Sequence, residues 1–310
     1  MSEGFGSVRL IARKDISTEK WEELVKQSNN TIFMSYWYLD AVMEDWSAFV
    51  LNDYELAFPI KMANKAGFNY ALQPLFLRSF SVIGTSIEKI NPFLENIFKS
   101  IDFSQLNFTA DLPLSIENST IQTSVYQFLT FREDYSILSK NYSENTRRKL
   151  KDFKKSNANF SELSTVSLLI DLFKKEKGEQ FAHLKADAYL RLEKLMNVAL
   201  VNKFGFIKAI ELEGELVAIG FFIRKDKQLL YLKGIVSGKG KKIGAMQALF
   251  DEVIQENCAS CIGLDFGGSS DAGLASFNKK FGACDMNYLI LKQNKMPWPL
   301  KKWVSKKLGL

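Results

Sequence analysis

The chain has 310 residues, of which 46% are hydrophobic and 25% charged, and its formal net charge is +6. This length exceeds the size at which one core usually keeps growing, so we expect a two-domain globular protein and exclude a disordered one. No apolar run approaches the roughly 20 residues of a bilayer-spanning helix, and the first residues lack a signal-peptide pattern, which predicts a cytoplasmic protein without a transmembrane segment.

Histidine and cysteine content restricts the chemistry further. His183 is the single histidine, so a Ser-His-Asp, Cys-His or multi-histidine metal site would have to be built on that residue. Cys258 and Cys261 form a C-x-x-C pattern, but no second pair of ligands accompanies it. We interpret both cysteines as small core residues and predict no metal.

The first part of the chain alternates short helical and strand patterns. Apolar spacing predicts helices at 17–27, 35–46 and 86–99 and strands at 49–62, 68–73, 80–83, 106–109 and 125–131. A polar stretch at 134–140 then marks a boundary, so the sequence predicts domains at 1–136 and 137–310. Both are expected to be mixed α and β.

Charge is divided unequally between these two parts. Residues 1–136 carry 17 acids and 11 bases, a net charge of −6, and residues 137–310 carry 18 acids and 30 bases, a net charge of +12. A basic half is typical of binding to a phosphate-rich cofactor, to RNA or to an anionic surface. Composition leaves these three partners open.

The second part begins with a strongly basic helix. Ser143 is a suitable N-cap, and six bases follow within nine positions, from Arg147 to Lys155. Such a helix either has a solvated face, borders a substrate channel, or contacts nucleic acid. Further helices are predicted at 168–181 and 188–202, and strands at 206–212 and 216–224.

Residues 229–245 form the most informative segment. The run from Leu229 to Val236 predicts a buried strand with a bulge at Lys233-Gly234. Residues 237–244 hold three glycines and three lysines, which predicts a charged loop. A helix beginning near Gly244 presents unpaired N–H groups and a partial positive charge, so it can hold a phosphate or pyrophosphate.

The segment that follows predicts a parallel strand and a closing helix. Cys261 to Phe266 has the pattern of a second buried strand, Gly267-Gly268 that of a turn, and residues 271–281 that of a helix ending at Gly282. The order strand, crossover helix, strand favours parallel pairing, with a ligand at the carboxyl ends of the strands.

Three motifs in this region carry a family resemblance. Lys239-Gly-Lys-Lys-Ile-Gly-Ala245 resembles the pyrophosphate loop of GNAT acyltransferases, and Phe277-Asn-Lys-Lys-Phe-Gly282 resembles their short closing helix. Asp265-Phe-Gly-Gly-Ser269 with Phe281-Gly-Ala283, and Asn141 to Leu150 upstream, are similar to bacterial FemAB-like proteins. The resemblance covers about 141–300 well. It implies an α/β (mixed α+β) fold of two tandem GNAT-like domains, each a mixed central sheet flanked by helices.

The resemblance also implies a function. It implies an N-acyltransferase that uses acetyl-CoA or another acyl-CoA as co-substrate and moves the acyl group to a primary amine, such as a small-molecule amine or amino sugar. The first domain would contribute to the acceptor pocket. The implied donor-binding residues are Ile235, Val236, Lys239, Gly240, Lys241, Lys242, Ile243, Gly244 and Ala245. The candidate catalytic residues are Tyr231, Lys233, Asp265 and Tyr288.

Two departures from the family pattern keep other functions open. Lys242 stands where the loop usually has its first glycine, and Phe277 stands where many GNAT enzymes have a tyrosine acid. One alternative is an aminoacyl-tRNA-dependent Fem-type transferase, with tRNA as partner; another is a non-catalytic binding protein. The basic end of the chain, Leu300 to Leu310, predicts either docking on its own domain or contact with an anionic membrane surface.

Overall fold

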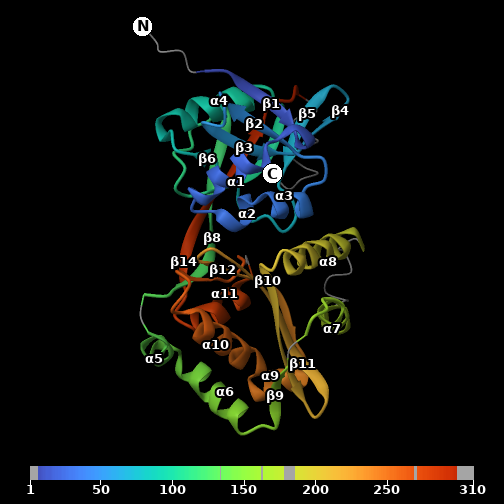
Figure 1. The fold of residues 1–310 in the computed structure, drawn as a ribbon, viewed down its shortest axis with the longest axis vertical. Helices are drawn as coiled ribbons and strands as arrows, with labels where there is room; N and C mark the ends of the chain where they lie inside the picture. The colour runs from blue at the N-terminus through green and yellow to red at the C-terminus, as the bar shows by residue number, and fades with distance from the viewer. Residues whose placement is uncertain (1–5, 133, 162, 178–185, 269–270, 299–310) are drawn as a thin grey trace. The chain divides into compact units, whose positions relative to one another are not determined.

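A computed structural model describes residues 6–132, 134–161, 163–177, 186–268 and 271–298 (Figure 1). The chain divides into two compact units: unit 1 comprises Met1–Ser124 and Asn287–Leu310, and unit 2 comprises Val125–Met286. The divisions fall within two strands, β8 (Ser119–Thr130) and β14 (Cys284–Asn294). The sequence predicted a single boundary, at 136/137. The end of β14 belongs to unit 1 because it pairs with β7, a strand of that unit. Assignment of 1–136 and 137–310 to GNAT-like domains stays a prediction.

Unit 1 is built on antiparallel strands with helices around them. One set has the order β1 (Val8–Ala12), β2 (Ser47–Leu51), β3 (Leu56–Ile60), β6 (Ile83–Gly84). The other has the order β4 (Met62–Lys65), β5 (Phe68–Leu72), β7 (Phe103–Thr109), and then residues 287–294 of β14, where β5 and β7 run parallel. The helices are α1 (Thr18–Lys26), α2 (Thr31–Met34), α3 (Tyr36–Val42) and α4 (Ile90–Lys99), with 3-10 turns at Arg13–Asp15 and Ile87–Lys89.

Aromatic side chains fill the core of unit 1. Trp21 and Trp46 are buried and meet edge to face, with ring centroids 5.1 Å apart. Phe58 stacks on Phe108 at 5.6 Å, and Phe98 packs against the same ring at 6.3 Å. The sequence missed β1 and α2, since both are too short to show a clear period.

Unit 2 holds a mixed sheet in the order β8, β13, β12, β11, β10, β9, counting residues 125–130 of β8. The strands are β9 (Ala158–Ser161), β10 (Gly205–Leu212), β11 (Glu215–Lys225), β12 (Gln228–Val236) and β13 (Gly263–Asp265). Only β12 and β13 are parallel among these pairs. The helices are α5 (Tyr135–Leu138), α6 (Glu144–Lys154), α7 (Ser167–Lys177), α8 (Ala186–Val201), α9 (Gly238–Ile243), α10 (Ala245–Asn257) and α11 (Ala272–Lys279), with a 3-10 turn at Ser139–Asn141.

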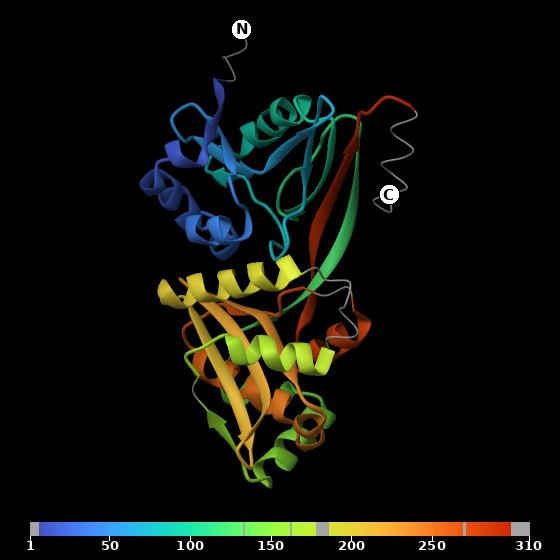
Figure 2. The same ribbon diagram turned by 90° about the vertical axis from the view of Figure 1, so that its right-hand side faces the viewer.

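Helices cover both faces of this sheet. Figures 1 and 2 show α7 and α8 on one face of β10 to β12, and α10 on the other. The apolar residues of α10 recur at helical spacing, and Leu249, Val253 and Ile254 are fully buried by the sheet. Ser143 caps α6 as predicted, because its hydroxyl accepts the Thr146 N–H at 3.1 Å. The predicted fold class, mixed sheets flanked by helices, is confirmed.

Candidate functional site

The candidate site lies in unit 2, where two parallel strands separate. β12 pairs with β13 from Gln228 to Leu230, whose partner is Asp265. β12 then continues to Val236, while β13 ends at Asp265. The predicted parallel pairing is therefore confirmed, and the carboxyl ends of such strands are where open α/β sheets bind ligands.

A bulge interrupts β12 just beyond this point. Phe221 is opposite Lys233 and Phe222 is opposite Tyr231, so Leu232 is the extra residue. The sequence predicted the bulge at Lys233-Gly234, one residue later. Because bulges twist a strand and re-aim its groups, this one changes the direction of the backbone N–H groups that follow.

Tyr231 is the last residue of β12 before the bulge. Its half-buried ring packs on Phe222 and Phe250, with ring centroids 5.3 and 4.8 Å away. Its hydroxyl lies beside Gly234, where a Cβ would come within 2.5 Å of that oxygen. Burial raises the pKa of Tyr231, so the phenol stays protonated at neutral pH and can donate a hydrogen bond.

Lys233 and Asp265 have structural contacts that reduce their availability. The Lys233 ammonium lies 4.3 Å from the centroid of the Phe173 ring on α7, a cation–π contact. Asp265 is buried, and its carboxylate accepts the Gly267 N–H at 2.9 Å, so it shapes the turn after β13. Gly267 has φ +81°, and a Cβ there would lie 2.5 Å from the Tyr231 carbonyl oxygen.

Tyr288 does not belong to the same unit as the other candidates. It lies on β14 within unit 1, opposite Thr109 of β7, and is half-buried. Tyr231, Lys233 and Asp265 therefore meet around the separation of β12 and β13, and Tyr288 is placed by a different sheet pairing.

The predicted charged loop at 237–244 is instead a short helix, α9. Ser237 is its N-cap, because its side chain accepts the Gly240 N–H at 3.1 Å and its carbonyl accepts the Lys241 N–H at 3.0 Å. Gly240 is required at this position, since a Cβ would lie 2.4 Å from the Val217 carbonyl oxygen. The glycines thus permit close packing on β11 rather than a solvent-exposed loop.

Gly244 joins α9 to α10 in a left-handed conformation, with φ +78°. Its N–H donates to the Gly240 carbonyl, and a Cβ there would lie 2.7 Å from the Lys149 carbonyl oxygen on α6. The Lys149 ammonium in turn donates to the Lys242 carbonyl at 2.8 Å. Helix α6 therefore covers one side of the junction that the sequence predicted to be open to a pyrophosphate.

The remaining predicted donor-binding residues divide into core and surface. Ile235 and Ala245 are buried, so a ligand would meet their backbone only, whereas Val236 and Ile243 are half-buried and pack against the core that contains Ala245. Lys239 forms an exposed ion pair with Glu215, which raises the pKa of Lys239 and lowers the pKa of Glu215. Lys241 and Lys242 are exposed and could hold a phosphate by charge alone.

Phe277, which stands where many GNAT enzymes have a tyrosine, packs in an aromatic cluster. Its ring lies 5.8 Å from Phe250 and 5.5 Å from Phe281, centroid to centroid. Phe250 is the centre of this group, because Phe222, Tyr231 and Phe266 also surround it. The aromatic cluster positions Tyr231, and Tyr231 is the phenol that the cluster presents next to the strand separation.

A half-buried carboxylate, that of Asp251, lies on the other side of α10. The Tyr135 hydroxyl donates to Asp251 at 2.9 Å, whereas the nearby Tyr142 hydroxyl is buried without a hydrogen bond of good geometry. Burial raises the pKa of Asp251, opposed by the hydrogen bond from Tyr135 and by the charge of Lys154. The protonated form of Asp251 is thus favoured more in the folded than in the unfolded chain.

We expect Asp251→Asn to raise the free energy of unfolding at pH 7 by on the order of 1 kcal/mol, because the amide keeps an acceptor for Tyr135 and carries no buried charge. Because the pKa of Asp251 is higher in the folded than in the unfolded chain, the wild-type protein becomes more stable as pH falls through the folded pKa toward the usual carboxyl value. The difference in free energy of unfolding between the two proteins therefore shrinks over that range. Urea unfolding of both proteins from pH 7 to pH 4 measures it. A constant difference across this range would contradict the assignment.

The cysteines, possible metal ligands and possible membrane segments can be described briefly. Cys258, Cys261 and Cys284 are free thiols, and burial raises the pKa of Cys261. No cluster of three metal-ligating side chains occurs in the described part of the chain, and no helix there is long and apolar enough to cross a membrane. His183 and the segment Leu300 to Leu310 lie outside the described residues.

Comparison with known proteins gives structural matches only. No family model matches the sequence, and no curated protein does. FemX is similar over 95% of this chain and 99% of its own, with TM-score 0.68 and 11% identity. L-PGS from Bacillus licheniformis has TM-score 0.55 and 14% identity over 95% and 98% of the two chains. A tandem GNAT protein from the clavulanic acid biosynthesis pathway has TM-score 0.56 and 9% identity over 94% and 99%.

The chain has a GNAT-like fold of the FemAB type. At these identities the likeness extends to the fold alone. Within this FemAB-type fold, sequence reasoning missed Glu215, because its pairing with Lys239 depends on the register of β11 and β12. It also missed Ser237 as an N-cap, although a serine three residues before Gly240 is a recognisable signal.

Proposed function

We propose that the protein transfers an acyl group to a primary amine, with the reactive carbonyl held along β12 beyond Leu230. The observation that carries this proposal is the separation of β12 from β13, with a bulge and a protonated phenol at the same place. Beyond Leu230, β12 pairs with β11 along one edge, and no described strand pairs with its other edge. The backbone N–H groups from Gly234 to Val236 that point to this open edge are therefore available to a developing oxyanion.

Tyr231 would pass a proton to the leaving group as the acyl bond to it breaks and would regain a proton from the amine nitrogen that has formed the new bond, in place of the tyrosine that Phe277 replaces. Tyr231→Phe keeps the ring and its packing, and we expect it to lower kcat by about 10²-fold while KM for the donor changes less than about threefold. Steady-state rates with an acyl donor and a panel of primary amines measure the effect. Equal rates in both proteins would exclude the phenol from the chemistry, and Tyr70→Phe, on β5 of unit 1, is the matched control.

Two acyl donors are compatible with the charges near this site. Acyl-CoA is the first candidate, because exposed Lys241 and Lys242 lie in the last turn of α9, the helix that follows β12, and could pair with a pyrophosphate. When bound, acyl-CoA supplies an activated thioester carbonyl. An aminoacyl-tRNA is the second candidate, because α6 presents Arg147, Lys151 and Lys154 on one exposed face, and Lys149 holds this helix on α9.

Two charge reversals distinguish these donors, each as the control for the other. Lys241→Glu/Lys242→Glu is expected to weaken acetyl-CoA binding at least tenfold by calorimetry, and Arg147→Glu/Lys151→Glu/Lys154→Glu on α6 is expected to leave it unchanged. Exposed positions are used because a substitution at Gly244 would clash with Lys149.

For an aminoacyl-tRNA donor the pattern is the reverse. The α6 variant would lose most tRNA affinity and reduce the slope of log K against log salt by about 2, from three lost phosphate contacts at roughly 0.7 each. If neither acetyl-CoA nor tRNA binds the wild-type protein, both donors are wrong. Binding of a donor without turnover on any amine would favour the non-catalytic binding protein.

A further inference from the structure

Strand β8 has one open edge within unit 1. In the order β7, β14, β8, strand β14 lies on one side of residues 119–124. On the other side, β13 pairs with β8 only at residues 128–130, and no other described strand reaches that side. Residues 119–124, the β8 edge, therefore present a row of backbone N–H and C=O groups to a partner strand.

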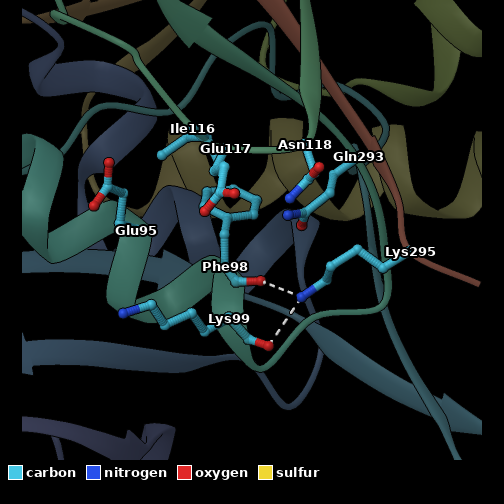
Figure 3. A pocket seen from close by; sticks show the side chains of 8 residues that line it. All are labelled: Glu95, Phe98, Lys99, Ile116, Glu117, Asn118, Gln293 and Lys295. Atoms are coloured by element: carbon cyan, nitrogen blue, oxygen red, sulfur yellow. Dashed lines mark hydrogen bonds between the residues drawn. The ribbon is translucent and has the colours of Figure 1, made fainter.

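A tight turn fixes the start of the β8 edge. Asn118, just before it, has φ +58°, and the Ser119 hydroxyl donates to the Ile116 carbonyl at 2.7 Å. Figure 3 shows Ile116 and Asn118 lining one small pocket together with Gln293 of β14. Because the turn is placed beside β14, the β8 edge is already extended before a partner binds, which lowers the entropy cost of pairing.

The β8 edge lacks the features that usually protect an open strand edge. The whole of β8, Ser119–Thr130, has 12 residues and contains neither a charged residue nor a proline. The other sheet edges in the described part of the chain differ: β1 has exposed Arg9, β4 has exposed Lys65, and β6 and β9 have only two and four residues. Charges, proline and short strands are the means by which proteins prevent edge-to-edge pairing. Their absence from so long a strand indicates that this edge has a partner.

Both faces of the β8 edge are accessible as well. Alternate side chains of a strand point to opposite faces of the sheet. Four consecutive side chains are nevertheless exposed, those of Thr120, Ile121, Gln122 and Thr123. No layer of unit 1 therefore covers either face of these residues, and a partner strand can approach without displacing one.

The β8 edge is complementary to itself in antiparallel register. Its sequence, Ser-Thr-Ile-Gln-Thr-Ser, differs from its own reverse only at the two central residues. A two-fold axis between these central residues would form three pairs, each of them twice: Ser119 with Ser124, Thr120 with Thr123, and Ile121 with Gln122. Hydroxyl side chains then lie opposite hydroxyl side chains, which is a favourable cross-strand pair, and no like charges meet.

We propose that the β8 edge binds the β8 edge of a second copy of this chain, so that the sheets of two unit 1 copies join across a two-fold axis. Backbone pairing alone would accept any strand, and the self-complementary side chains select a second copy. An isologous contact closes, so it gives a dimer rather than a fibre. Six residues from each copy make a small contact, so dimerisation depends on protein concentration. The proposal does not rest on acyl transfer.

The test is sedimentation velocity of the full-length chain over a concentration series. The wild type should shift from monomer to dimer as its concentration rises. Ile121→Lys/Gln122→Lys places lysine opposite lysine in both central pairs and should raise the dimer Kd at least about tenfold. Ile121→Glu/Gln122→Glu should do the same by itself. An equal mixture of the two variants should associate again, with a Kd within about threefold of the wild type, because each lysine then meets a glutamate.

The matched control is Thr130→Lys/Val201→Lys, which adds the same charge at two exposed positions outside the β8 edge and should keep the wild-type Kd. A second measurement needs no variant. Amide hydrogen exchange of residues 119–124 in the wild type should slow as its concentration rises, because half of these N–H groups gain a partner in the dimer.

Three results would overturn the proposal. The first is a wild type that stays monomeric at every concentration. The second is a lysine variant, folded by circular dichroism, that dimerises as the wild type does, since the contact would then lie elsewhere. The third is amide exchange of residues 119–124 that does not change with concentration while the protein dimerises.

Discussion

Replacing Gly244 with alanine is expected to lower the free energy of unfolding by about 2–5 kcal/mol. An L-residue in the left-handed region costs roughly 1–2 kcal/mol, and overpacking adds roughly 1–3 kcal/mol. Both apply here, because Gly244 has φ +78° and a Cβ would lie 2.7 Å from the Lys149 carbonyl oxygen and 2.9 Å from the Lys149 Cβ. Urea unfolding of the full chain measures the loss.

Gly214 is a matched control for the packing part of this loss. It has φ +77°, almost the same as Gly244, but a Cβ there would meet no atom within 4 Å. Gly214→Ala should therefore show the conformational cost alone, about 1–2 kcal/mol. Equal losses at the two glycines would show that α6 yields without cost, and the junction of α9 and α10 would then be open on that side.

Phe250→Ala is expected to have the largest effect on stability, about 3–5 kcal/mol. The Phe250 side chain is 1% exposed, and five aromatic rings surround it, so truncation leaves a cavity that rigid rings fill poorly. The Tyr231 ring, 4.8 Å away, loses its support as well. A partial rescue by Phe250→Leu would distinguish lost volume from lost aromatic contacts.

The control for this change is Phe160→Ala on the edge strand β9, where the side chain is 42% exposed. We expect a loss below about 1 kcal/mol there, because most of the ring is already in water. If Phe250→Ala cost no more than Phe160→Ala, the aromatic cluster would not be a rigid support, and Tyr231 would need another explanation for its position.

Local patterns were enough for the long elements of unit 2. Helix α10 follows from the apolar spacing of Leu249, Val253 and Ile254, and α6 follows from its cap at Ser143. The parallel pair of β12 and β13 follows from the order strand, helix, strand. The helices depend on contacts within a few residues of the chain, which the sequence contains directly, whereas the strand pairing joins distant residues and follows from the order of the elements alone.

The error at 237–244 shows where local reasoning stops. Three glycines and three lysines favour a loop when only neighbours along the chain are considered. In the folded chain Gly240 approaches the Val217 carbonyl and Gly244 approaches Lys149, so the same glycines allow a packed helix. The sequence contains no record of how close two distant backbones come, and that closeness decided the conformation.

The sequence by itself determined the mixed α/β class and the main helices and strands of unit 2, and it assigned Tyr231, Lys233 and Asp265 to neighbouring strands. Only the tertiary structure decided which candidate residues have other partners: Lys239 with Glu215, Lys233 with Phe173 and Asp265 with Gly267. The reason is physical. Periodicity records which face of an element is buried, whereas the partner of a polar group depends on strand register and helix packing between segments far apart in the chain.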